Sequence, residues 1–189
     1  MSDVLIIGGG QAGCMVATNL RKQKFKGSIT IVTDEAYYPY QRPPLSKGFL
    51  VGTSKADKLF FKSENYYEKN KISILTKKLA EKIDIKKQTV TFKDGGTMSY
   101  RKLVLTTGSK LNKITEKEDK KIIYLNSISQ AIALKTKLEE CKSIGIIGAG
   151  YIGLEVAAAA KKTGLATRVF EAEERIMKRS ASKEIAGFL

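Results

Sequence analysis

Short apolar runs alternate with helical patterns along the chain, and the same sequence of elements occurs twice. Residues 4–7 and 144–147 are short, almost wholly apolar stretches of the kind that forms buried strands. A glycine-rich turn follows each run, and then apolar positions recur with the period of an amphipathic helix. Further strands are expected at 28–33 and 167–170. The repeated order of strand, helix and strand predicts an α/β protein with parallel strands.

The region between the two repeats has a different pattern. It predicts a helix at 64–70, a strand at 72–75, and short alternating strands at 82–85, 89–92 and 102–105. The turn Asp94-Gly95-Gly96 separates two of these strands, which indicates a hairpin. A second crossover helix is expected at about 127–141, because Ser127 and Gln130 have the spacing of a capping box.

These elements predict two Rossmann-like dinucleotide-binding units, the second of them incomplete, with a small antiparallel β insertion. We expect one domain at residues 1–112 and another at 113–189, with the boundary in the charged stretch 110–121.

A glycine fingerprint lies at each strand-to-helix turn. The first reads Gly-Gly-Gly-Gln-Ala-Gly over residues 8–13, and the second reads Gly-Ala-Gly-Tyr-Ile-Gly over 148–153. The first glycine of G-x-G-x-x-G permits a tight turn, the second lets a pyrophosphate approach the backbone, and the third lets helix and strand pack closely. Two fingerprints predict two nucleotides, held by Gly8, Gly10 and Gly13 and by Gly148, Gly150 and Gly153.

Acidic residues follow the second strand of each unit, where a ribose hydroxyl is bound in such folds. Asp34 and Glu35 follow the first, although an ordinary acidic loop is the alternative. Glu171 follows the second and favours a 2′-hydroxyl, hence NAD over NADP. Arg175 and two further basic residues, Lys178 and Arg179, follow closely enough to offset that preference.

The segment 37–47 is rich in tyrosine and proline. Its prolines exclude a regular strand or helix interior and predict a fixed, extended loop. Such a loop can hold Arg42 and Lys47 beside the first fingerprint. A proline-rich segment that binds a partner is the alternative, but the prolines are few.

Composition narrows the function classes. The net charge is +15, yet most of the 34 basic residues are scattered lysines, which favours a solvated surface or an acidic protein partner over nucleic acid. With no histidine and two isolated cysteines, a metal site or a Ser-His or Cys-His pair is not expected. Cys14 is expected to be a small buried residue. The lack of a long apolar run or a leader predicts a cytoplasmic protein that does not span a membrane.

Taken together, these segments resemble the FAD-dependent pyridine-nucleotide oxidoreductases that reduce small electron carriers of the ferredoxin and rubredoxin type. The resemblance covers the first fingerprint and residues 40–47, 94–108 and 148–155. The most specific part is Arg-Pro-Pro-Leu-Ser-Lys at 42–47. Related disulfide reductases would need a cysteine pair on the first helix, and peroxide-reducing relatives a cysteine near position 42; the chain has neither.

The resemblance implies an NADH-dependent flavoprotein reductase that passes electrons to a small acidic iron–sulfur carrier. It assigns FAD to the first fingerprint and to Asp34, Glu35, Arg42, Lys47, Ala80, Thr107 and Gly108. NAD(H) would be held by the second fingerprint, Glu171 and Arg175. Lys47 and Glu155 would meet at the flavin–nicotinamide junction, as an ion pair or in a close approach, with no covalent catalyst required.

The chain departs from that family in two respects. Where relatives have a proline and an FAD-binding arginine after the Thr-Gly element, residues 108–112 read Gly-Ser-Lys-Leu-Asn. Family members also continue well beyond 189 residues, so the isolated chain is not expected to be a competent reductase. The alternatives are the flavoprotein part of a nitrite reductase and a non-catalytic nucleotide-binding fragment.

Overall fold

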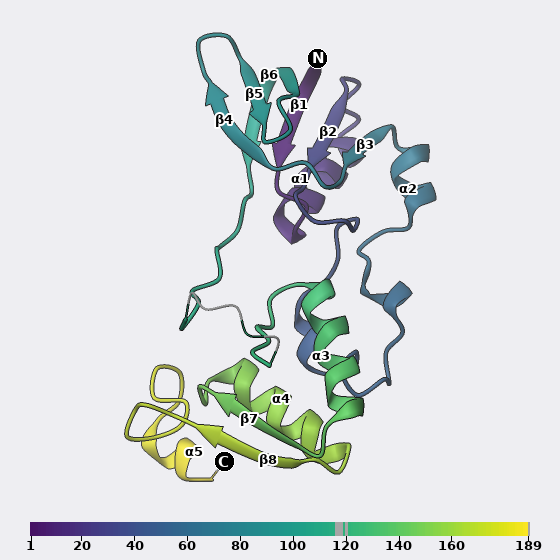
Figure 1. Ribbon diagram of the computed structural model, residues 1–189. Coiled ribbons are helices and arrows are strands. Elements are labelled where there is room, and N and C mark those ends of the chain that lie inside the picture. Colours follow the sequence, from purple (N-terminus) through teal and green to yellow (C-terminus); the bar gives the residue numbers. More distant parts are fainter. Residues whose placement is uncertain (116–118, 120, 189) are drawn as a thin grey trace. The chain divides into compact units, whose positions relative to one another are not determined.

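The computed structural model describes residues 1–115, 119 and 121–188, which form two compact units (Figure 1). The first unit comprises residues 1–41 and 57–110, and the second comprises residues 42–56 and 111–189. Residues 116–118 and 120 of the expected charged boundary lie outside the described residues. The assignment of one nucleotide to each of the domains 1–112 and 113–189 stays a prediction.

The first unit is built on one sheet with the strand order β3-β2-β1-β6-β5-β4. The strand β1 pairs in parallel with β2 and with β6, and β2 pairs in parallel with β3. The strands are β1 (Ser2–Ile7), β2 (Ile29–Val32), β3 (Ile72–Leu75), β4 (Ala80–Asp84), β5 (Thr89–Phe92) and β6 (Thr97–Leu105). The predicted α/β class with a mainly parallel sheet is therefore confirmed.

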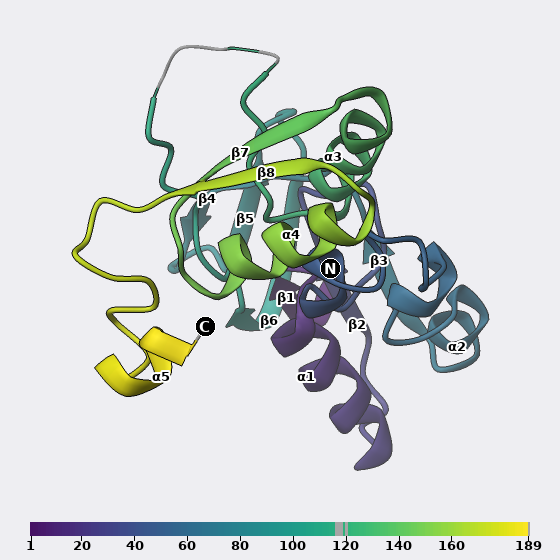
Figure 2. The same ribbon diagram turned by 90° about the horizontal axis from the view of Figure 1, so that it is seen from below.

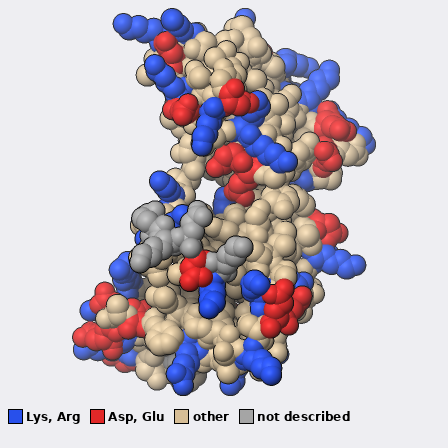
Figure 3. Space-filling view, in the orientation of Figure 1, with Lys and Arg blue, Asp and Glu red and all other residues tan. Residues whose placement is uncertain are grey.

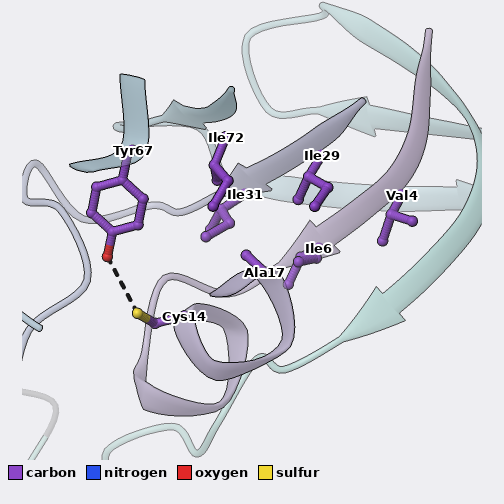
Figure 4. Close-up of a cluster of buried hydrophobic side chains, with 8 residues drawn as sticks. All are labelled: Val4, Ile6, Cys14, Ala17, Ile29, Ile31, Tyr67 and Ile72. Atoms are coloured by element: carbon purple, nitrogen blue, oxygen red, sulfur yellow. Dashed lines mark hydrogen bonds between the residues drawn. The ribbon is translucent and has the colours of Figure 1, made fainter. Parts of the chain in front are cut away.

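Alternate side chains of β1 enter two different cores, as the period of a strand requires. Val4 and Ile6 face α1 (Gln11–Lys22) and α2 (Glu64–Lys69), where they pack with the buried residues of Figure 4. Leu5 and Ile7 belong to a second cluster, with Val32 and the buried residues of the hairpin, Val90, Phe92 and Tyr100. Both faces of β1 are covered, which explains its continuous apolar run.

Cys14 lies on α1 within the first of these cores and is 1% exposed. Its Sγ and the hydroxyl of Tyr67 are 3.3 Å apart, as the dashed line in Figure 4 shows. The expectation that Cys14 is a small buried residue is confirmed.

The antiparallel insertion is formed by β4, β5 and β6. The expected hairpin turn is present, and Gly95 adopts a φ of +83°, a conformation that favours glycine. β6 begins at Thr97, five residues before the strand predicted at 102–105. Its first half pairs with β5 and its second half with β1, so one long strand links the hairpin to the parallel sheet.

The second unit contains two parallel strands, β7 (Ser143–Ile147) and β8 (Ala166–Phe170). The helix α4 (Tyr151–Lys162) lies along this pair in Figures 1 and 2. The other helices of the unit are α3 (Ile128–Glu140) and α5 (Lys183–Phe188). The core joins α3, α4 and β7 through the buried residues Leu134, Leu138, Ile146, Val156, Ala159, Ala160 and Leu165, with Leu50 from the segment 42–56.

The predicted capping box at the start of α3 is present. The Ser127 hydroxyl accepts from the Gln130 backbone N–H, and the Gln130 side chain accepts from the Ser127 backbone N–H at 3.1 Å.

The prediction of an extended loop is wrong at residues 43–46, which form the 3₁₀ helix η1 (Pro43–Ser46). Pro43 and Pro44 occupy its first positions, where the fixed φ of proline suits a helical turn and no backbone N–H is needed. A second 3₁₀ helix, η2, covers Ala56–Leu59. The turn at η1 places Ser46 and Lys47 next to each other at its carboxyl end.

Basic side chains are spread over the face of the molecule seen in Figure 3 and are interspersed with acidic ones in each unit. This distribution is typical of a solvated surface. Within the part of the chain that the structure describes, no helix combines the length and apolar character that a membrane crossing needs.

Candidate functional site

The first glycine fingerprint forms a tight turn between β1 and α1. Gly8 has a φ of +117°, and a Cβ there would lie 2.1 Å from the carbonyl oxygen of Thr106. A Cβ on Gly13 would lie 2.1 Å from the carbonyl oxygen of Gly8, so the helix packs directly on the turn. At Gly10 a Cβ would meet no atom within 4 Å. The turn is therefore closed on its inner side and open at Gly10, as backbone approach by a pyrophosphate requires.

The second fingerprint repeats this geometry at its second and third glycines, whereas a Cβ on Gly148 would meet no atom within 4 Å. Gly148 has a φ of +98°, and a Cβ on Gly153 would lie 1.9 Å from the Gly148 carbonyl oxygen. Gly150 is open in the same sense as Gly10. The backbone angles of these two residues are almost equal, with φ −83° and ψ −169° at Gly10 and φ −85° and ψ −171° at Gly150. Each open glycine precedes the first turn of a 12-residue helix, whose free N–H groups favour an anion.

Thr106 supports the first turn. Its hydroxyl donates to the carbonyl oxygens of Ile7 and Gly8, both at 3.1 Å. Its backbone N–H donates to the Ile7 carbonyl oxygen at 2.8 Å. Thr107 and Gly108, the predicted second nucleotide contact, follow directly, so the end of β6 carries them to the fingerprint. Their contact with a nucleotide stays a prediction.

Asp34 and Glu35 follow β2. The first glycine turn also contacts β2, because the Gly8 N–H donates to the Val32 carbonyl oxygen at 2.8 Å. Asp34 is exposed, and a Glu35 carboxylate oxygen accepts from the Tyr40 hydroxyl at 2.5 Å. The segment leading to Ala80 runs beside this pair, because the Lys77 N–H donates to the Glu35 carbonyl oxygen at 3.0 Å. Asp34, Glu35 and Ala80 thus belong to one region of the first unit.

In the second unit Glu171 contacts the fingerprint itself. One carboxylate oxygen accepts from the Ala149 N–H at 2.6 Å, and the other from the Glu173 N–H at 3.0 Å. The hydrogen bond from Ala149, then that from Glu173, lowers the pKa of Glu171 below its usual value. A carboxylate that stays ionised there repels a phosphate and accepts hydrogen bonds from hydroxyl groups.

A pocket of about 280 Å³ lies between this fingerprint and the turn after β8. Besides the glycines it is lined by Glu171, Glu173, Arg175 and Lys178, among others. The Arg175 guanidinium donates to the carbonyl oxygens of Ile176 and Lys178, and its Nε is buried without a hydrogen-bond partner. Lys178 Nζ lies 2.8 Å from a Glu173 carboxylate oxygen. The predicted pair Glu171 and Arg175 is thus brought together at the fingerprint.

Lys47 and Glu155 form an ion pair within the second unit. Lys47 follows η1 and Glu155 lies in the second turn of α4, and the Lys47 Nζ is 2.8 Å from Oε1 of Glu155. Ser46 donates from Oγ to Oε2 of the same carboxylate at 2.5 Å. Burial alone would raise the pKa of Glu155, but the hydrogen bonds from Lys47 and Ser46, with the lysine charge, outweigh it and lower that pKa.

Arg42 lies beside this ion pair. It donates from Nη1 to the Asn126 carbonyl oxygen and lines a pocket of about 320 Å³ that Lys47, Glu155 and Ile152 also line. Arg42 and Lys47 belong to the second unit, whereas the first fingerprint belongs to the first. Their expected contact with a nucleotide at residues 8–13 stays a prediction.

Two residues of the site were not singled out by the sequence. Thr106 carries a signal that could have found it, because it immediately precedes the predicted Thr107-Gly108 element. Ser46 carries none beyond its place in the proline segment, since its partner is 109 residues away.

Comparison with known proteins gives one family and a consistent set of relatives. The sequence pattern of the pyridine nucleotide-disulphide oxidoreductases matches residues 2–189. The chain is 38% identical to rhodocoxin reductase from Rhodococcus erythropolis, over 98% of this chain and 44% of that protein. It is 38% identical to a rubredoxin-NAD(+) reductase from Pseudomonas putida, over 98% of this chain and 49% of that protein. The chain spans about half the length of the curated relatives it matches.

Solved structures of reductases also match this chain. The covalent putidaredoxin reductase–putidaredoxin complex matches 99% of this chain and 46% of the solved chain, with a TM-score of 0.93 and 31% identity. NADH:rubredoxin oxidoreductase from Clostridium acetobutylicum matches 99% of this chain and 49% of the other, with a TM-score of 0.87 and 29% identity.

Proposed function

Because the chain belongs to the pyridine nucleotide-disulphide oxidoreductase family, we propose that it forms the FAD- and NADH-binding part of a flavoprotein reductase. This reductase passes electrons to a small iron–sulfur carrier of the ferredoxin or rubredoxin type. The observation that carries the proposal is the pair of glycine turns with the same backbone geometry, one in each unit, each open at its second glycine.

The residues of the first turn fit the pyrophosphate of FAD. Gly10 leaves the backbone open, the N-terminus of α1 supplies free N–H groups, and no acidic residue occupies the first turn of that helix. Asp34 and Glu35 would hold the adenosine ribose, and Ala80 would offer its backbone to the adenine. Arg42, Lys47, Thr107 and Gly108 complete the proposed FAD site.

The second turn fits NAD(H). Gly148, Gly150 and Gly153 would hold its pyrophosphate, and Glu171 would accept hydrogen bonds from the adenosine ribose. The ionised Glu171 favours a 2′-hydroxyl, while Arg175 stabilises the turn after β8 through its bonds to backbone carbonyls. We therefore propose NADH rather than NADPH as the electron donor.

Lys47 and Glu155 act together at the proposed flavin–nicotinamide junction. FAD held there would supply the capacity to take a hydride from NADH and to pass electrons on one at a time, which is chemistry of the cofactors. The protein contributes placement and charge: Glu155 stays ionised, and it holds the Lys47 ammonium in one position. Neither side chain needs to gain or lose a proton.

The proposed partner is an acidic carrier, because complementary charge accelerates encounter and the chain has a net charge of +15. The relatives support this class, since they include rubredoxin-NAD(+) and ferredoxin–NAD(+) reductases. A cytoplasmic location belongs to the same proposal.

The proposal is tested by identifying the nucleotide that copurifies with the chain, or with the longer protein that contains it. The preparation is expected to be yellow, and heating should release FAD that chromatography identifies. Recovery of NAD without any flavin would reverse the assignment of the two sites. If neither nucleotide copurifies, and neither binds when it is added in large excess, the non-catalytic fragment is favoured.

A further inference from the structure

Ser46 and Lys47 contact different oxygens of the Glu155 carboxylate. The Ser46 hydroxyl donates to Oε2 at 2.5 Å, and the Lys47 ammonium lies 2.8 Å from Oε1. The two donors are consecutive residues at the end of η1, while the acceptor belongs to α4. Each carboxylate oxygen therefore has its own donor, and both donors come from one short segment.

The two donors differ in how firmly they are held. Ser46 is 5% exposed, whereas the side chain of Lys47 is 52% exposed. A partly exposed lysine loses considerable rotamer freedom in an ion pair and gains little from it in water. A buried serine loses little rotamer freedom, and a hydrogen bond to a charged acceptor is among the stronger ones. The rigid anchor of the carboxylate is thus Ser46.

We propose that Ser46 is a positioning residue, which fixes the orientation of the Glu155 carboxylate and through it places the Lys47 ammonium. Ser46 acts through Glu155 and does not itself contact a reacting atom. The proposal rests on the proposed function only for the use of the ion pair, because the hydrogen bond and the ion pair join residues of this chain alone.

Two further basic residues line the pockets that Glu155 lines. Arg42, at the start of the η1 segment, lines the 320 Å³ pocket together with Glu155. Lys162, at the end of α4, lines a neighbouring pocket of about 490 Å³ that Ser46 and Lys47 also line. Loss of the Ser46 hydrogen bond should raise the pKa of Glu155, because that bond is one of the contacts that lower it.

The test is a titration of the Glu155 carboxyl by ¹³C NMR in the chain without nucleotide, with the signal assigned by Glu155→Gln. In the unaltered chain the pKa should lie below 4.5. Ser46→Ala should raise it by about one unit, and Ser46→Thr, which keeps the hydroxyl, should restore it. Ser143→Ala, an exposed serine on β7, is the matched control and should leave it unchanged.

Ser46→Cys covers the case in which Ser46→Ala does not fold, because a thiol is a weaker donor of nearly the same shape. It should raise the pKa of Glu155 by less than the alanine variant does. An unchanged pKa in the folded alanine or cysteine variant, or an equal shift in Ser143→Ala, would overturn the proposal. A chain that fails to bind FAD would refute the proposed function and leave this titration unaffected.

Discussion

The third glycine of each fingerprint has a steric role that can be separated from nucleotide binding. Gly13 lies against the Gly8 carbonyl oxygen, and Gly153 lies against that of Gly148. A methyl group at either position must displace backbone rather than a flexible side chain. Gly10, only three residues before Gly13, faces open space and adopts angles that alanine also accepts.

We expect Gly13→Ala to destabilise the protein by about 1–3 kcal/mol, because α1 must move away from the turn. Gly10→Ala is the matched control and should change the free energy of unfolding by less than about 0.5 kcal/mol. Urea unfolding followed by circular dichroism measures both. Equal stability of the two variants would show that the helix does not pack on the turn as described.

The two cysteines should differ sharply in reactivity. Burial of Cys14 raises the pKa of its thiol above the usual 9.0, an effect that the bond with Tyr67 and the charge of Lys62 only partly offset. Cys141 is partly exposed. At pH 8 a chromogenic disulfide reagent should therefore titrate one thiol per folded chain and two after denaturation. Rapid titration of both thiols in the folded chain would contradict the packing around Cys14.

Single residues were predicted well where a backbone constraint identifies them and poorly where only a side-chain contact does. The fingerprint glycines are recognisable because few other residues fit a close approach or a positive φ. Ser46 is not, since its role depends on a carboxylate that the fold brings to it from another element. Hydrophobic pattern and local spacing contain no information about such a pair.

At the scale of elements, the turn after β8 is the part that should select the nicotinamide nucleotide. Glu171 is held at the fingerprint by backbone N–H groups, and Glu173 pairs with Lys178 in the same pocket. The two carboxylates offset basic side chains that could otherwise bind a 2′-phosphate.

The double variant Glu171→Ala/Glu173→Gln should bind NADPH more tightly relative to NADH by about tenfold or more, equivalent to about 1.4 kcal/mol. It removes the repulsion and frees the Lys178 ammonium. Glu174→Gln is the control, because Glu174 lies 3.9 Å from Lys178 and does not line the pocket. Calorimetric titration with each nucleotide gives the ratio, and a ratio equal to that of the unaltered chain would refute the role of these carboxylates.

Elements with a clear period were predicted within a few residues, and the errors have physical causes. β6 was predicted too short because its first residues pair with β5 in the hairpin and do not belong to an apolar run. Residues 43–46 were predicted as extended because proline excludes a helix interior, although it suits a first helical turn. The errors thus arose from strand pairing and from the first turn of a short helix, and not from the hydrophobic pattern.

At the scale of the whole molecule, we propose two nucleotide sites of different specificity in one chain, with one glycine turn in each unit. Both turns are open at their second glycine, where a Cβ would meet no protein atom within 4 Å, so there is room to begin a side chain there. It would occupy the space that a pyrophosphate needs, with little cost to the fold. Gly10→Glu and Gly150→Glu are therefore a matched pair, identical in charge and in local backbone geometry.

The most direct test is equilibrium dialysis of FAD and of NADH against the unaltered chain and these two variants. Gly10→Glu should abolish FAD binding and leave NADH binding in place, while Gly150→Glu should do the reverse, because a carboxylate in the turn excludes a pyrophosphate. Loss of the same nucleotide in both variants, or the opposite pairing of variant and nucleotide, would contradict the assignment of FAD to the first unit and NADH to the second.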